Sequence, residues 1–141
     1  MDGRYLVTAH YGADVVCLID TETLSVTATI DGISEPYSAV IAGDRAYVSA
    51  ASNAEDAVVA VDTQTAVPLA AKTFDMTIGG MAVGPAGDVL YVGRAGEETV
   101  DIAVIDIESG SVSSIAIPPA APALPSRRCG STPTAPACSP R

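Results

Sequence analysis

The side chains that could perform chemistry stand in short polar segments between apolar runs. The chain carries 17 Asp and Glu residues and one histidine, His10. A single histidine excludes a multi-histidine metal site, and no set of Ser, His and carboxylate can be assembled from spacing alone. Glu97, Glu98 and Asp101 could gather around Ca²⁺, but they lack the Asp, Asn and Gly alternation of a dedicated calcium loop. The sequence therefore predicts no catalytic residues, no metal and no cofactor.

The charge balance narrows the classes of partner. The formal net charge is −10, and residues 1–117 hold all 17 acids against four Lys and Arg, which gives that part −13. Such a charge repels nucleic acid and anionic membrane surfaces. No run of about 18 apolar residues predicts a membrane span, and no basic start followed by an apolar stretch predicts a signal peptide. The sequence as written is therefore expected to be cytoplasmic.

Residues 118–141 differ in composition from the rest. They hold seven of the ten prolines and a net charge of +3, and proline prevents both helix and central strand. We expect this basic tail to be disordered. Cys129 and Cys138 lie in it, and the third cysteine, Cys17, lies in a strand-like run. An odd number of cysteines without a repeated spacing predicts neither a disulfide framework nor a metal site.

The polar segments repeat along the chain together with the strands that flank them. Tyr5, Tyr47 and Tyr91 are spaced by 42 and 44 residues, and so are Asp20, Asp62 and Asp106. A period in the low forties, built from short β-branched runs separated by Gly, Asp, Asn and Pro, is typical of four-stranded propeller blades. The repeats span about residues 3–42, 43–86 and 87–117.

Each repeat divides into strands, and the first has only the last three of four. The 11 expected strands are 4–9, 15–20 and 24–30; 37–42, 45–50, 57–62 and 67–74; and 80–83, 89–93, 101–106 and 111–117. Many runs, such as Val15–Ile19, are apolar at every position, as expected of strands packed on both faces. The predicted fold is all-β: antiparallel propeller blades in an incomplete ring, followed by the proline-rich tail.

These residues resemble a known family. Residues 2–8, 16–23 and 26–30 together with Glu35 and Pro36 resemble the YVTN-repeat, YncE-like β-propellers, and Tyr47-Val48-Ser49 and Tyr91-Val92-Gly93 are weaker forms of the name motif. The resemblance covers residues 2–117. It implies a seven-bladed ring that serves as a binding platform in the periplasm, at the cell surface or in the envelope, and it implies no fixed catalytic residues.

The repeated aspartates are expected to have a structural role. Asp20, Asp62 and Asp106 each begin the hairpin between a third and a fourth strand, where the carboxylate would accept backbone N–H groups one and two residues on. Gly87 lies in the turn between a first and a second strand, at a position expected to need positive φ.

The remaining polar loops should share one face of a propeller. These loops join second to third strands and one blade to the next, and that face is strongly acidic. We expect it to attract a basic protein or a cationic ligand. The candidate residues for this face are His10, Tyr11, Asp14, Glu35, Glu55, Asp56, Arg94, Glu97 and Glu98.

Fewer than three blades leave apolar blade faces open, which permits three interpretations. The first is a non-catalytic binding or scaffold protein, truncated from a longer YVTN-type propeller. The second is a propeller enzyme of the lactone-cleaving or cyclising type. The third is a short repeat protein whose copies associate through the open faces into a closed ring.

Translation of the tail in another reading frame favours the first interpretation. Codons that combine the third base of one residue with the first two bases of the next, from Arg128 to Cys138, permit Leu-Arg-Phe-Asn-Pro-Asp-Gly-Thr-Arg-Leu. This string would be an inner strand running into an Asn-Pro-Asp-Gly turn. The hypothesis is that residues after about Ile117 are a frameshifted reading of the next blade.

Overall fold

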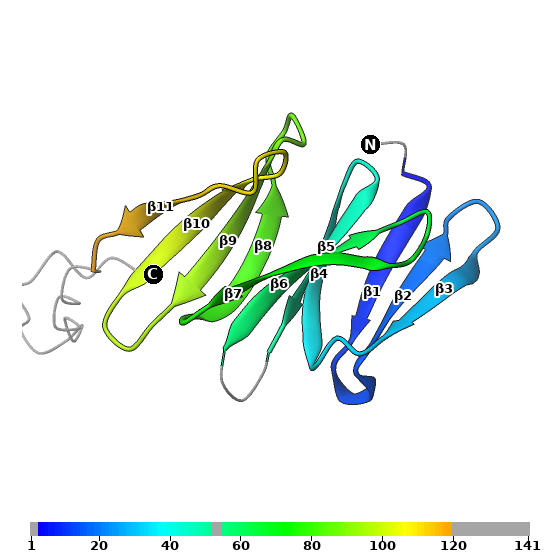
Figure 1. Ribbon diagram of the computed structural model, residues 1–141, viewed down its shortest axis with the longest axis horizontal. Helices are drawn as coiled ribbons and strands as arrows, with labels where there is room; N and C mark the ends of the chain where they lie inside the picture. Colours follow the sequence, from blue (N-terminus) through cyan, green and yellow to red (C-terminus); the bar gives the residue numbers. More distant parts are fainter. Residues whose placement is uncertain (1–2, 52–54, 120–141) are drawn as a thin grey trace, which may run out of the picture.

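A computed structural model describes residues 3–51 and 55–119, and these form 11 strands in three antiparallel sheets (Figure 1). Sheet A contains β1 (Tyr5–His10), β2 (Val15–Asp20) and β3 (Ser25–Asp31), with a short 3-10 helix, η1 (Tyr11–Ala13), between β1 and β2. Sheet B contains β4 (Pro36–Ala42), β5 (Arg45–Ala50), β6 (Asp56–Asp62) and β7 (Pro68–Phe74). Sheet C contains β8 (Thr77–Val83), β9 (Val89–Ala95), β10 (Val100–Asp106) and β11 (Val112–Ile117).

The predicted all-β architecture is confirmed, including the absence of a fourth strand from the first sheet. The expected strand starts agree with the structure to within one residue except at β8, which begins at Thr77, three residues before Gly80. Thr77 pairs with Ala95 and Ile78 with Arg94, and a register shift between Ile78 and Gly80 lets the ladder continue past the glycines. The boundary at residue 118 stays a prediction, because Cys129, Cys138 and most of the proposed frameshifted tail lie outside the described residues.

The sheets stack face to face, as blades do. One core cluster fills the space between sheets A and B and is built from Val16, Leu18, Ile30, Ile33, Ala46, Val48, Ala50 and Val61. A second fills the space between sheets B and C and is built from Ala42, Tyr47, Val58, Phe74, Ile78, Leu90, Val92, Ala103 and Ile105. Sheet B is therefore covered on both faces, which explains why its strands are apolar at successive positions.

The two outer sheets each present an open apolar face. Leu6 and Val26 of sheet A are 51% and 59% exposed, and Ile115 and Ile117 of sheet C are 52% and 43% exposed. The described strands do not close into a ring (Figure 1). No helix among the described residues is both long enough and apolar enough to cross a bilayer.

The antiparallel strands divide the connections between two ends of the stack. We call one end the loop face; it carries the loops β1–β2, β3–β4, β5–β6, β7–β8 and β9–β10. The other end, the turn face, carries the turns β2–β3, β4–β5, β6–β7, β8–β9 and β10–β11. Gly87 lies in the β8–β9 turn, where its φ is +74° and its N–H donates to the Gly84 carbonyl at 2.9 Å.

Three equivalent aspartates organise the turn face. Asp62 Oδ1 accepts hydrogen bonds from Gln64 N at 2.8 Å and Thr65 N at 2.9 Å, which are two and three residues on rather than one and two. Asp20 does the same with Glu22 N and Thr23 N, and Asp106 accepts from the N–H and hydroxyl of Ser109. These bonds favour the carboxylate, so the pKa of each aspartate lies below its ordinary value, chiefly because of the backbone N–H donors.

Truncating the interface between sheets B and C should destabilise the whole stack. Leu90 is fully buried there, so Leu90→Ala is expected to lower the free energy of unfolding by about 2–5 kcal/mol. Leu24→Ala removes the same atoms from a side chain that is 83% exposed, and its effect should stay within about 0.5 kcal/mol. Urea denaturation followed by circular dichroism measures both, and equal effects would contradict the stacked-blade core.

Acid should weaken the fold through the Asp turns. Because their folded-state pKa values are lowered, the aspartates stabilise the fold above the unfolded pKa of about 4, and this stabilisation is lost as the pH falls through the folded values. Asp62→Asn should make the midpoint of urea unfolding less dependent on pH between about 5 and 2. Asp75→Asn removes the same charge from an exposed loop and controls for net charge. If the urea midpoint of Asp62→Asn changed with pH in parallel with that of the wild type throughout, the aspartate turns would not be the cause of the acid sensitivity.

Candidate functional site

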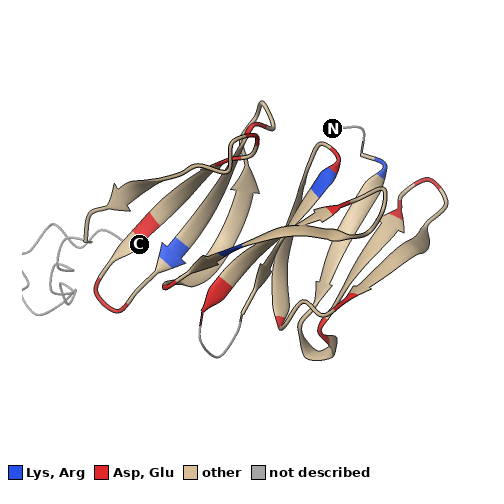
Figure 2. Ribbon diagram, in the orientation of Figure 1, with Lys and Arg blue, Asp and Glu red and all other residues tan. Residues whose placement is uncertain are grey.

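The loop face concentrates negative charge. Nine of the chain's Asp and Glu residues lie in its loops or within one residue of the strand ends that border it: Asp14, Asp31, Glu35, Glu55, Asp56, Asp75, Glu97, Glu98 and Asp101. Arg94 is the one Lys or Arg residue among the described residues of this face. Figure 2 shows how sparsely Lys and Arg are distributed over the sheets beside Asp and Glu.

The first group of candidate residues joins sheet A to sheet B. Asp14, at φ +52° after η1, accepts a hydrogen bond from Glu35 N through Oδ1 at 2.7 Å. The Glu35 carboxylate, by its charge and by accepting a hydrogen bond, raises the pKa of the Tyr11 phenol. His10 Nε2 lies 3.0 Å from the Thr8 hydroxyl. The structure thus brings Tyr11, Asp14 and Glu35 together where two loops meet, while His10 lies at the adjoining end of β1.

Asp56 repeats the role of Asp14 one blade further on. Its Oδ2 accepts a hydrogen bond from Ile78 N at 2.8 Å, so a carboxylate at the start of β6 fastens the entry to β8. Tyr37 lies nearby and was not predicted as a site residue. Burial, opposed by a hydrogen bond with Ser49, raises its pKa, and the charge of Asp56 adds to the rise. Glu55 is exposed next to residues 52–54, which lie outside the described part of the chain.

Arg94 lies on the loop face, but its side chain has a structural role. Its Nε and Nη2 donate to the two carboxylate oxygens of Asp101 at 2.8 and 2.6 Å, and its guanidinium lies 5.1 Å from the centre of the Phe74 ring. The side chains of Arg94 and Asp101 are only 13% and 19% exposed. Arg94 therefore joins sheet C to the last residue of sheet B, and its charge is already matched.

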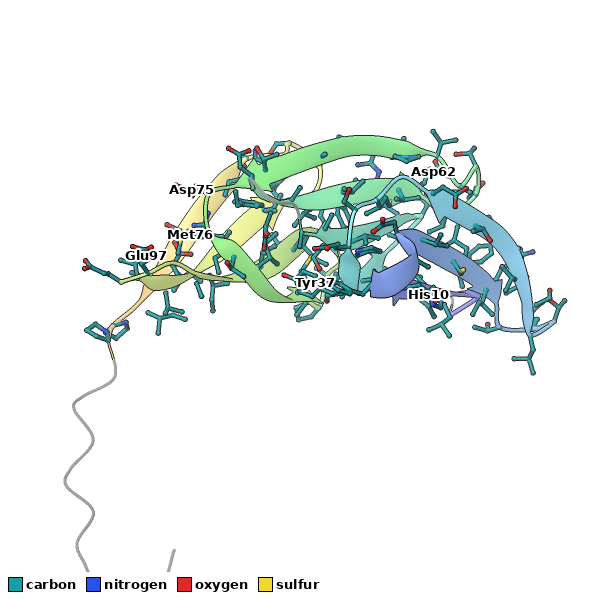
Figure 3. All side chains as sticks on the ribbon, turned by 90° about the horizontal axis from the view of Figure 1, so that it is seen from below. His10, Tyr37, Asp62, Asp75, Met76 and Glu97 are labelled. Atoms are coloured by element: carbon teal, nitrogen blue, oxygen red, sulfur yellow. The ribbon has the colours of Figure 1, made fainter. Side chains whose placement is uncertain are left out.

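Glu97 and Glu98 stand at the exposed tip of the β9–β10 loop. The neighbouring Gly96 packs against Met76: a Cβ at Gly96 would lie 3.4 Å from the Met76 methyl carbon. In Figure 3, Asp75, Met76 and Glu97 lie at one side of the loop face and His10 lies well away from them. The predicted residues consequently form two separate groups, from neighbouring blade junctions, rather than one convergent site.

The charged groups that this face presents are chiefly carboxylates. In the described part of the chain, no three His, Cys, Asp or Glu side chains come together as metal ligands would. The hydrogen bond of His10 is with Thr8, and no carboxylate among the described residues orients its ring. The sequence could not reveal that Arg94 and Asp101 pair, because their contact depends on the β9–β10 register, in which they stand opposite each other.

Removing the Arg94 guanidinium should weaken the junction between sheets B and C. Arg94→Gln leaves the partly buried Asp101 carboxylate without its bidentate partner, so the free energy of unfolding should fall by about 1–3 kcal/mol. Arg4→Gln removes an arginine that is 56% exposed and 3.5 Å from Asp20, and should have the smaller effect. Thermal unfolding measures both. A loss from Arg94→Gln no larger than that from Arg4→Gln would refute the structural role.

Comparison with known proteins agrees with this architecture. No protein-family profile matches the chain. Over 117 residues, 81% of its length, the chain is 32% identical to the seven-bladed β-propeller protein Rv1057 of Mycobacterium tuberculosis. It spans 30% of the length of that relative.

Solved structures show the same fold. The hydrazine synthase of Kuenenia stuttgartiensis superimposes with a TM-score of 0.72 at 24% identity, over 83% of this chain and 34% of that one. The β-propeller domain of Cps50 (Swd1) from Myceliophteria thermophila gives 0.60 at 18% identity, over 82% and 36% of the two chains. The dihydro-heme d1 dehydrogenase NirN gives 0.62 at 17% identity, over 84% and 27%. The three sheets are therefore blades of a β-propeller.

Proposed function

We propose that the chain is a non-catalytic binding or scaffold module whose loop face takes a basic protein segment or another cationic ligand. The observation that carries this proposal is the charge of the loop face, where nine carboxylates accompany one arginine and that arginine is already bound to Asp101. Fixed charges of one sign on one face speed the encounter with a partner of opposite sign and repel nucleic acid.

The loops that carry these charges are held in place before a ligand arrives. Asp14 and Asp56 fasten neighbouring blades through backbone N–H groups, and Glu35 is positioned by the bond that its own N–H donates. Loops that are already ordered lose less conformational freedom on binding. The exposed Asp75, Glu97 and Glu98 are available to meet a partner.

The proposal extends to the assembly in which this face works. The open faces of sheets A and C, and a seven-bladed relative of which the chain spans 30%, support a larger propeller of the YVTN type. For such a propeller the resemblance favours the periplasm, the cell surface or the envelope. Hydrazine synthase and NirN are enzymes by name, but a likeness below 25% identity concerns the fold alone, so the enzyme alternative gains nothing from them.

A peptide of ten lysines tests the charge of the loop face. Neutralising four exposed acids there (Glu55→Gln, Asp75→Asn, Glu97→Gln and Glu98→Gln) should weaken binding of the labelled peptide about ten-fold or more in fluorescence anisotropy at low salt. Added salt should weaken the wild type more steeply than this variant.

The matched control neutralises four acids of the turn face (Glu22→Gln, Asp44→Asn, Asp88→Asn and Glu108→Gln) and has the same net charge. It should bind the peptide within about two-fold of the wild type. Equal losses in the two variants would mean that only net charge matters, and the assignment to the loop face would fail.

A further inference from the structure

A groove of about 370 Å³ opens between sheets B and C beside the β10–β11 turn, away from the loop face. Its floor is the buried cluster of Tyr47, Val58, Leu90 and Ile105. One wall is strand β7, with Ala70, Ala71 and Lys72, and the opposite wall is the turn from Asp106 to Gly110. The groove is independent of the proposed binding at the loop face.

The equivalent space between sheets A and B is filled by apolar side chains. Val16 pairs with Ile30 in sheet A, and Val58, 42 residues later, pairs with Lys72 in sheet B. Both sheets have a register shift two residues after these valines, so Ile30 and Lys72 are structurally equivalent. Ile30 is buried at 4% exposure, whereas Lys72 is exposed.

The turn that forms the opposite wall also lacks an apolar side chain that the equivalent turn of sheet B has. Leu24, Ala66 and Gly110 occupy equivalent positions in their turns, four residues after the repeated aspartate of each blade. All three have positive φ. Ala66 packs against the core between sheets A and B. Gly110 has no side chain to pack, so the wall that faces Lys72 recedes. Two changes at facing positions therefore leave the groove open.

Two positively charged side chains also line this groove, and one of them has N–H donors that no hydrogen bond uses. Of the four Lys and Arg residues in the described chain, Arg4 pairs with Asp20 and Arg94 with Asp101. The other two, Arg45 and Lys72, make no ion pair within the described residues, and both line the groove. The Lys72 ammonium donates one hydrogen bond, to the Gly110 carbonyl at 3.0 Å, which leaves two of its three N–H donors.

The Arg45 charge interacts with Asp62, its register partner in β6, and helps to lower the pKa of that carboxyl. The carboxylates that line the groove make no ion pair with Lys72 within the described residues. Asp106 accepts the N–H and hydroxyl of Ser109 within its own turn. Glu108 lines the same wall but makes no ion pair with Lys72, whose partner is the Gly110 carbonyl. An apolar floor beside cations with free donors is complementary to an organic anion.

We propose that the groove between sheets B and C binds a small carboxylate with an apolar, aromatic-sized body. The body lies against Ala60, Ala71 and Ile107, above the buried Tyr47, Leu90 and Ile105. The carboxylate accepts a hydrogen bond from Lys72, while Arg45 adds positive charge from β5. A groove of 370 Å³ equals the liquid volume of about twelve waters, which suits a ligand of about ten to fifteen non-hydrogen atoms.

The first test uses 3-phenylpropionate as the probe, with 3-phenylpropan-1-ol and 3-phenylpropylamine as uncharged and cationic matches. Titrated into the full chain, 3-phenylpropionate should shift the amide NMR resonances of Ala70, Ala71 and Gly110, with a Kd of about 1 mM. The alcohol should bind about ten-fold more weakly, because it loses a charged hydrogen bond. Tighter binding of the amine, or no shift at these three amides up to about 20 mM probe, would overturn the proposal.

Variants assign the effect to Lys72. Lys72→Gln should weaken binding about ten-fold, Lys72→Arg should restore it to within about two-fold, and Arg4→Gln, which removes a cation elsewhere, should leave it unchanged. Lys72→Ile reproduces the residue found at the equivalent position of sheet A, so it should fold and should abolish the shifts. Binding that survives both Lys72→Gln and Lys72→Ile contradicts the proposal. The variant with four neutralised loop-face acids should bind 3-phenylpropionate as the wild type does, so this result is independent of the lysine-peptide test.

Discussion

The structure depends on apolar blade faces that must be covered by a neighbouring blade. A four-stranded antiparallel sheet made of Val, Ile and Ala has no stable existence in water with both faces open, and in the described residues the two clusters of buried hydrophobic side chains lie between sheets. With one Phe and no Trp, the cores are filled by many small contacts rather than by a few large ones. Sheet B, covered on both sides, is therefore the element on which the other two depend, and loss of one interface should be felt across the stack.

This packing explains why the two ends of the stack differ. The turn face is built from the same device three times: an aspartate accepts backbone N–H groups of its own turn, and the next residue donates to the carbonyl that precedes the second strand, as Thr63 N does to Asp44 O at 3.0 Å. The loops of the loop face are no longer than the turns of the other end, at two to five residues each, but they do not share this repeated aspartate turn. Only short clamps from Asp14 and Asp56 limit them, and acids could accumulate there without cost to the core.

Much of this could be predicted from the sequence because the repeat is strong. Eleven strands, the three-stranded first sheet and the Asp turns follow from spacings of 42 and 44. What could not be predicted depends on the register between paired strands and on contacts between sheets. Tyr5 stands opposite Asp20, but Tyr47 stands opposite Ala60, so the repeated tyrosines are equivalent in sequence and displaced by two residues in the sheet. The pairing of Arg94 with Asp101 could not be predicted for the same reason. The spacing of seven residues between these opposite charges does not indicate that Phe74, from another sheet, packs against Arg94.

Positions that break the repeat carry more information about function than those that keep it. A residue shared by all blades, such as the turn aspartate, is explained by what every blade needs. Lys72 in the place of Ile30, and Gly110 in the place of Ala66, each make the packing between blades poorer, and neither change helps the sheet that contains it. Because both face the same space, and because the two cations without an ion pair line it, the loss of packing is coordinated rather than scattered. Coordinated loss of packing in an otherwise regular stack is what a ligand site requires, since a filled interface has no room for a guest.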